Sequence, residues 1–202
     1  MKLVPPSLER LVHELSRLPG VGEKSALRYS LSLYRGGTER VDSLKTALAE
    51  MQDRIGTCPE CYFWTDAGRC ALCENQERGS EKICVVRDSP DVLALEKFRT
   101  QSWRYHVLQG FLSPLAGRGP SQIRLRELFK RIDVTKSEEV ILAFDATLEG
   151  DATAFYIRDQ AKMLFPQLKI TRMALGLPAG SSVEYLDPST LESALSHRTM
   201  VE

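Results

Sequence analysis

Four cysteines form two C-x-x-C pairs, Cys58 with Cys61 and Cys70 with Cys73, and eight residues separate the pairs. Two such pairs supply four thiolates in a tetrahedron, the donor set of a structural zinc site with no position left open for catalysis. Residues 66–68 (Asp-Ala-Gly) can make the tight turn that the short spacer requires. The alternative is a redox pair or reduced core cysteines, but neither pair begins a helix of a βαβ unit. We therefore expect Zn²⁺ at these four residues.

The stretch LPGVGEKSALR, residues 18–28, has the pattern of a helix-hairpin-helix. Gly20 and Gly22 permit a turn with positive φ and a close approach of backbone to a phosphate. The free amides and the dipole of the following helix favour an anion there. Lys24 and Arg28 lie four residues apart on one helix face, where both can reach the same DNA backbone. The alternatives are a plain interhelical turn with solvated basic residues, or a contact between subunits.

Three acids, Asp145, Glu149 and Asp151, follow the strand expected at residues 139–144. Open α/β sheets place their sites at the carboxyl ends of strands. Carboxylates there can hold Mg²⁺ and, with a general acid, support phosphoryl transfer. Acids near a helix N-terminus also stabilise the helix dipole without any ligand. These residues alone leave both interpretations open.

The strand expected at residues 83–86 ends at Arg87, where many nucleic-acid enzymes carry a catalytic carboxylate. A guanidinium cannot accept a proton near neutral pH, because its pKa lies above ~12, and it repels Mg²⁺. Arg87 can pair with Asp145 if the two strand ends are neighbours. Cys84, within the strand, is expected to be a small buried hydrophobic residue rather than a ligand.

The elements that must position these residues follow two patterns. The N-terminal part is expected to be helical, with a first helix capped by Ser7, a second at 23–34 and a third at about 41–55. Beyond Lys82, short apolar strands alternate with helices. The expected strands are 83–86, 105–108, 139–144 and 168–172, the helices are 90–98, 123–132, 151–164 and 188–195, and a Gly/Pro-rich loop covers 113–122. This alternation predicts a mainly parallel sheet covered on both faces.

The bulk composition describes an ordinary globular chain that is large enough for one large or two small domains. It has 202 residues and zero net charge, from 27 basic and 27 acidic side chains. Zero net charge argues against nonspecific coating of nucleic acid, so any DNA contact must come from a local patch. No run approaches the ~18 apolar residues of a membrane span, and the N-terminus lacks a secretory signal. We expect a cytoplasmic, nucleoid-associated protein.

Taken in order, these stretches resemble the RecR family of bacterial recombination mediators along nearly the full chain. The pieces that carry the resemblance are LPGVGEKSALR, the cysteine spacing, YHVLQGFLSPLAGRGP, LEGDATAFYI and GLPAGSSVEY. The resemblance implies an α/β multidomain protein. Its expected parts are a helix-hairpin-helix domain (1–56), a four-cysteine zinc finger (57–79), a Toprim domain with a mainly parallel sheet (80–174) and a C-terminal helical segment (175–202).

The resemblance also implies a noncatalytic DNA-binding mediator. Such a protein forms a homo-oligomeric ring or clamp, a dimer or a tetramer, that acts with RecO and RecF to load RecA onto SSB-coated single strands during repair. Lys24 and Arg28, with Gly20 and Gly22, match the DNA-binding positions of the hairpin. Glu149 matches the Toprim acid associated with RecO contact, and Asp145 and Asp151 lie beside it in the sequence.

The chain departs from the family pattern at the expected Toprim site. Arg87 replaces a Glu, Asp145-Ala146 replaces Asn-Pro, and Leu148 and Asp151 differ from the usual residues. The competing hypothesis is a Toprim-type, Mg²⁺-dependent primase or nuclease. Arg87 and the shortness of the chain argue against that enzyme. A purely protein-binding scaffold is a third hypothesis, but it leaves the two basic residues of the hairpin without a phosphate partner.

Overall fold

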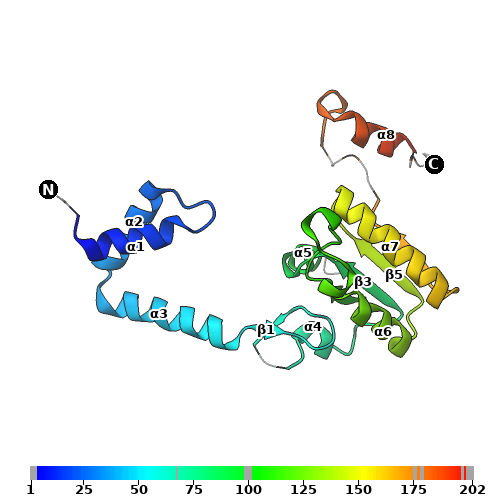
Figure 1. Ribbon diagram of the computed structural model, residues 1–202, viewed down its shortest axis with the longest axis horizontal. Helices are drawn as coiled ribbons and strands as arrows, with labels where there is room; N and C mark the ends of the chain where they lie inside the picture. The colour runs from blue at the N-terminus through cyan, green and yellow to red at the C-terminus, as the bar shows by residue number, and fades with distance from the viewer. Residues whose placement is uncertain are drawn as a thin grey trace. The chain divides into compact units, whose positions relative to one another are not determined.

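The computed structural model describes residues 4–66, 68–97, 102–174, 177, 180–196 and 198. The chain divides into two compact units, Met1–Ile55 and Gly56–Glu202. In its described part, the first unit contains three helices, α1 (Pro6–Ser16), α2 (Glu23–Arg35) and α3 (Gly37–Arg54) (Figure 1). The expectation that Ser7 caps α1 is wrong. Pro6 occupies the first helical position, where its fixed φ suits a helix, so Ser7 lies inside the first turn.

The first unit has a very small core. Ala26 and Ser30 are its only buried side chains among the described residues, and the Ser30 hydroxyl donates to the Ala26 carbonyl at 2.8 Å. The apolar stripe expected on α3 does form at helical spacing, but it is exposed. Its members are between 41% and 54% exposed: Leu44, Leu48, Met51 and Ile55. Three helices with an open apolar face bury little surface by themselves.

The second unit begins with a small cysteine-containing module. The short strands β1 (Gly56–Thr57) and β2 (Trp64–Thr65) pair antiparallel, and the four-residue helix α4 (Ala71–Glu74) follows. Gly68 has a φ of 59°, as a tight turn requires, whereas Ala67 of the expected turn lies outside the described residues.

A four-stranded parallel sheet forms the centre of the second unit, as expected. Its order is β4 (Arg104–Val107), β3 (Lys82–Val86), β5 (Glu139–Ala143), β6 (Lys169–Arg172). The connecting helices are α5 (Ser89–Leu95), α6 (Leu125–Thr135) and α7 (Leu148–Leu164). Phe98, the expected end of α5, lies outside the described residues.

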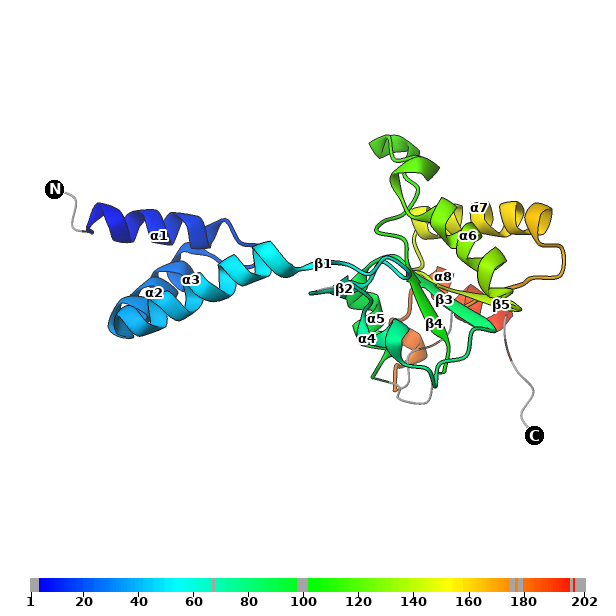
Figure 2. The same cartoon turned by 90° about the horizontal axis from the view of Figure 1, so that it is seen from below.

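Both faces of the sheet are covered, because alternate residues of each strand point to opposite sides. Ile83 and Val85 join a core with apolar residues of α6 and α7. Cys84 and Val86 face the other way, toward α5 and the cysteine module. Figure 2 shows α6 and α7 on one side of the sheet and α4 and α5 on the other. Cys84 is 1% exposed, which confirms the expectation for it.

The local sequence explains two differences from the expected bounds. Helix α7 begins three residues earlier than expected, because the Thr147 side chain accepts a hydrogen bond from the Gly150 amide and caps it. The expected loop at 113–122 contains two short 3₁₀ turns, Pro114–Ala116 and Pro120–Gln122, and α6 starts only after them. Near the C-terminus a 3₁₀ turn, Val183–Tyr185, precedes α8 (Pro188–Ser196). Within the described residues, no helix is both long and apolar enough to cross a membrane.

Candidate metal centre and nucleic-acid interface

The four cysteine thiols converge on one point. Their Sγ atoms all lie within 4.8 Å of one another, and the Sγ atoms of Cys61 and Cys70 are 3.4 Å apart. Four sulfurs at about 2.3 Å from a central zinc stand roughly 3.8 Å apart in a regular tetrahedron, so this spacing fits a bound metal ion. Cys58 and Cys61 are fully buried, and Cys70 and Cys73 are 4% exposed. Among the described residues, this is the one group of His, Cys, Asp and Glu side chains that could hold a metal.

A tight backbone turn shapes each of the two cysteine pairs. The Tyr62 amide donates to the Cys58 carbonyl at 2.9 Å, and the Cys73 amide donates to the Cys70 carbonyl at 3.0 Å. Tyr62 has a φ of 65°, an unusual conformation for a residue with a side chain, and its ring packs edge-on against His106. The turn that presents the thiols is therefore held against the sheet domain.

Positive side chains surround the thiol cluster. Arg131 of α6 lies 3.9 Å from the Cys73 sulfur and also donates to the Glu60 and Tyr105 carbonyls. The hydrogen bond with Cys61 lowers the pKa of Cys73 to about 6, with a further lowering by Arg131, and it raises the pKa of Cys61. The hydrogen bond with Cys61 and the charge of Arg131 thus favour the thiolate of Cys73, and a bound metal ion would displace the thiol protons.

Sequence reasoning missed Arg131. It lies 58 residues from Cys73 in the chain, and its position depends on how α6 packs against the cysteine module. No local pattern could have found it.

At the carboxyl edge of the sheet, Arg87 and Asp145 form an ion pair. The Arg87 Nη1 donates to the Asp145 Oδ2 at 2.8 Å, because β3 and β5 are neighbouring parallel strands that end together. The Arg87 guanidinium also lies near the Asp88 carboxylate and over the Phe111 ring. The pairing foreseen from the sequence is therefore present.

The other two acids take separate partners. The Ser113 hydroxyl donates to the Glu149 carboxylate at 2.8 Å. Arg172 and Asp151 form an ion pair in which the Arg172 Nη2 lies 3.0 Å from the Asp151 Oδ1, without the alignment of a hydrogen bond. Asp145, Glu149 and Asp151 therefore do not form a shared cation site in the described structure. A pocket of about 390 Å³ lies between Glu149, Arg87 and Arg118.

Close packing fixes the conformation of the chain at the carboxyl edge of the sheet. A Cβ on Gly150 would stand 2.4 Å from the Asp145 carbonyl, so the turn from β5 into α7 requires glycine. The Thr153 hydroxyl donates to the Glu149 carbonyl and accepts from the Leu112 amide at 3.0 Å. The chain near residues 112 and 113 is thereby joined to the first turns of α7, a connection that the sequence did not reveal.

The hairpin of the first unit has the expected positive φ at Gly20 but not at Gly22, whose φ is −78°. Gly20 adopts a φ of 78°, and Gly22 is the extended residue before α2, with no side-chain cap on the helix. The first amides of α2 are therefore open to a ligand. Lys24 and Arg28 are exposed on α2, and neither forms an ion pair with another described residue.

Known proteins resemble the chain over almost its whole length. It is 42% identical to the Recombination protein RecR of Myxococcus xanthus, over 97% of this chain and 98% of that protein. It is 43% identical to the Recombination protein RecR of Trichlorobacter lovleyi, over 96% of each. The chain belongs to the RecR family.

Three family models divide the chain in the RecR order. The RecR helix-hairpin-helix matches residues 8–52, the Toprim domain matches 81–174, and the RecR C-terminal model matches 176–199. The first match includes the glycine hairpin, and the second includes the ion pair at the sheet edge. Membership of the RecR family assigns the protein to DNA recombination and repair.

Proposed function

We propose that this protein is a noncatalytic recombination mediator that holds the DNA backbone with its helix-hairpin-helix. The observation that carries the proposal is the hairpin itself, in a chain of the RecR family. Gly20 and Gly22 leave backbone amides open, and the unpaired Lys24 and Arg28 stand on the adjoining helix face. Contacts of this kind bind phosphates without reading sequence, which suits a protein that must act at any damaged site.

The Toprim edge supports a role without catalysis. Arg87 is already paired with Asp145, and a guanidinium that stays protonated cannot serve as a general base. The protein would therefore use the frame of a Toprim enzyme as a binding surface. Mg²⁺-dependent nicking, strand relaxation and primer synthesis should all be absent from the purified protein.

Zinc is the metal that the cysteine cluster suits best. Four buried thiols from two C-x-x-C turns match its preference for sulfur and for a closed tetrahedron. Arg131 would offset part of the negative charge of the tetrathiolate site. The zinc would have a structural role, joining the finger to the Toprim domain.

We further propose that the subunits assemble into a ring or clamp. The exposed stripe Leu44, Leu48, Met51 and Ile55 supports this, because a solvated apolar face on a unit with almost no core is stabilised by a second copy. Several hairpins in one assembly add their weak phosphate contacts by multivalency, which compensates for the zero net charge of each subunit.

RecO and RecF are the proposed protein partners, and RecA loading onto SSB-coated single strands at the nucleoid is the proposed outcome. Of the three acids considered for RecO contact, Asp145 and Asp151 are paired with arginines. Glu149 accepts a hydrogen bond from the Ser113 hydroxyl and forms no ion pair with a described residue, and the neighbouring Leu148 is 90% exposed. An uncompensated acid beside an exposed leucine suits a basic, partly apolar partner surface.

The test of the main proposal is gapped-duplex DNA binding, measured by fluorescence anisotropy across a salt series. Lys24→Glu/Arg28→Glu should weaken binding and reduce the log–log salt slope by roughly one to two units, at about 0.9 per phosphate contact. Equal binding by the wild type and the variant would show that the hairpin is mainly a subunit contact.

A further inference from the structure

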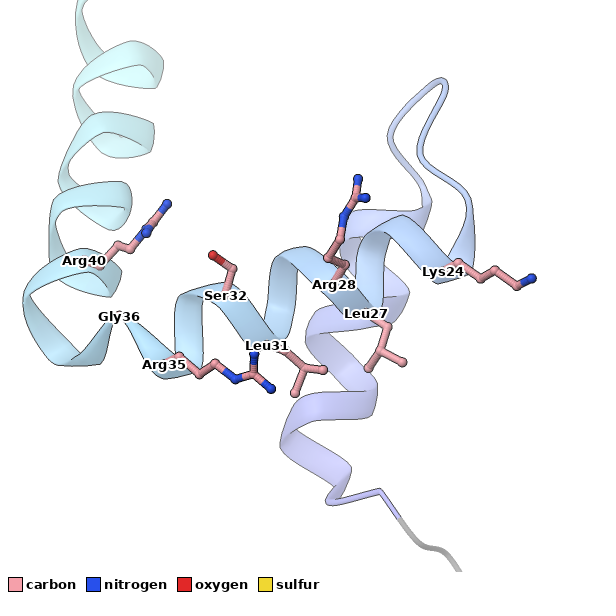
Figure 3. A pocket seen from close by; sticks show the side chains of 8 residues that line it. All are labelled: Lys24, Leu27, Arg28, Leu31, Ser32, Arg35, Gly36 and Arg40. Carbon is pink, nitrogen blue, oxygen red and sulfur yellow. The ribbon is translucent and has the colours of Figure 1, made fainter.

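The hairpin adjoins a long groove on the first unit, and the groove extends well beyond it. This groove of about 520 Å³ is lined by one face of α2 and by the start of α3. Figure 3 shows the lining side chains spread along α2, from Lys24 at the hairpin end to Arg35 at the far end, with Arg40 beyond the corner. The sequence motif includes only the first two of its four basic residues.

The spacing of these residues puts them on one surface. Counted from Lys24, the other lining residues of α2 stand at +3, +4, +7, +8 and +11, which is the pattern of a single helix face: Leu27, Arg28, Leu31, Ser32 and Arg35. Eleven residues at 1.5 Å per residue separate the first and last by roughly 16 Å, long enough for several successive phosphates of one strand.

The corner between the helices places the fourth basic residue at the same groove. Gly37 adopts a φ of 71°, which turns the chain from α2 into α3. The Arg40 side chain packs closely over Gly36, where a Cβ would stand 2.5 Å from its Cδ. Glycine at position 36 therefore makes room for the stem of this arginine and leaves its guanidinium at the groove.

The groove carries positive charge that the described structure does not neutralise. None of Lys24, Arg28, Arg35 and Arg40 forms an ion pair with a described residue. In the same unit, Arg17 and Lys45 do have acidic partners, Glu14 and Asp42, at 3.2 and 2.9 Å. The four basic groups at the groove thus remain available to an anion supplied from outside.

We infer that the backbone of a nucleic-acid strand lies along this groove, and that Arg35 and Arg40 bind its phosphates in addition to the hairpin. Leu27 and Leu31 offer apolar contacts to the sugars between those phosphates. This inference rests on the proposed function and extends it, because a strand would then follow α2 to its C-terminal end. Such contacts recognise a charged backbone and not a base sequence.

The experiment compares three double variants of the full-length protein: Arg35→Ala/Arg40→Ala, Lys24→Ala/Arg28→Ala, and the control Lys45→Ala/Arg54→Ala. Each removes two positive charges from the first unit, but the control residues do not line the groove. Binding to gapped duplex is measured across salt by anisotropy, and the mass of each assembly is measured by light scattering.

Arg35→Ala/Arg40→Ala should retain the wild-type mass and lose about 1.8 units of salt slope on duplex, at about 0.9 per contact, while the control keeps the wild-type slope. If Arg35→Ala/Arg40→Ala keeps the wild-type slope while Lys24→Ala/Arg28→Ala has a reduced slope, the proposal that a strand lies along the groove is wrong. The proposal that the hairpin binds DNA would still stand. A change in mass with an unchanged affinity per assembly also overturns the groove proposal, because the groove is then a contact between subunits. Equal losses in the control overturn it as well, since general charge would then explain the binding.

Discussion

A single residue, Arg87, sets the charge at the carboxyl edge of the Toprim sheet. Arg87 stands at the end of β3, and its guanidinium reaches across to Asp145 at the end of β5 at 2.8 Å. The pair satisfies both charges and leaves Glu149, hydrogen-bonded to Ser113, as the acid of this edge without a described cationic partner. If this surface binds a partner as proposed, recognition would depend on one carboxylate more than on a cluster.

The first prediction at this scale concerns Glu149. Glu149→Arg should weaken RecO binding by tenfold or more, because about 1.4 kcal/mol corresponds to a factor of ten and a buried charge pair contributes more than that. Isothermal calorimetry measures the change. Asp159→Arg, an exposed acid farther along α7, serves as the control. Unchanged affinity for Glu149→Arg would exclude this acid from the contact.

The second prediction concerns His106, which is completely buried. Its Nε2 donates to the Arg124 carbonyl at 2.9 Å, and its Nδ1 has no partner among the described residues. Burial is the main reason that the pKa of His106 is lowered to about 3. The hydrogen bond to the Arg124 carbonyl opposes this effect in part, and the charges of Arg131 and Arg124 add to it. The folded protein therefore keeps this imidazole neutral.

Because the folded pKa is below the unfolded value, the titration of His106 causes no change in the free energy of unfolding above about pH 6.5. Below that pH the unfolded chain takes up a proton that the folded chain refuses, so stability falls with a slope of at most about 1.4 kcal/mol per pH unit, down to about pH 3. His106→Gln, which can still donate to Arg124, should show a shallower slope between pH 6 and 4 in urea unfolding. Parallel curves for the two proteins would contradict this.

At the scale of elements, the cysteine module and the sheet domain support each other. Arg131 of α6 donates to carbonyls of both parts, and the Val107 amide donates to the Cys61 carbonyl at 2.8 Å. Tyr62, Phe63 and Leu72 of the module pack against the core on one face of the sheet. Loss of the metal should therefore destabilise the sheet domain as well as the module.

Removal of the proposed zinc ion by a chelator under reducing conditions should lower the melting temperature by at least roughly 5 °C, since each kcal/mol shifts it by about 2–4 °C in a chain of this size. Calorimetry measures the shift, and elemental analysis identifies the metal. Cys58→Ser should lose the metal. Cys84→Ala should keep it, because Cys84 is buried in β3 and lies outside the cluster. A melting temperature insensitive to chelation would argue against a structural metal.

At the scale of the whole molecule, the two units differ in the size of their hydrophobic cores. The sheet domain has an extensive core on each face, whereas the first unit buries two side chains among its described residues. Burial of apolar surface stabilises a fold by about 25 cal/mol per Å². The first unit would therefore gain stability from the proposed assembly, which would also bring several hairpins to one DNA.

Leu48→Glu/Met51→Glu should reduce the size of the assembly, because both side chains are about half exposed on α3 and would carry charge into an apolar contact. Light scattering measures the mass at several concentrations. Met163→Glu is the control, since Met163 is 78% exposed on α7 in the other unit. An unchanged mass for the α3 variant would place the subunit contact elsewhere.

The sequence by itself determined the features that depend on short spacing. The cysteine pairs, the glycine hairpin and the alternation of strands with helices are encoded within a few residues, because local turns and side-chain periodicity set them. Arg87 and its expected partner Asp145 could also be named in advance, since only neighbouring strands were required. Ser7 shows the limit of such rules. It was expected to cap the first helix, but the helix begins one residue earlier, at Pro6.

Only the tertiary structure decided which distant groups meet. Tertiary packing pairs Arg87 with Asp145, Ser113 with Glu149 and Arg172 with Asp151, so three acids close in sequence take three separate partners. The packing of α6 carries Arg131 to the thiols, and the turn at Gly36 and Gly37 brings Arg40 to the groove on α2. These contacts depend on the relative placement of whole elements, which local propensity does not specify.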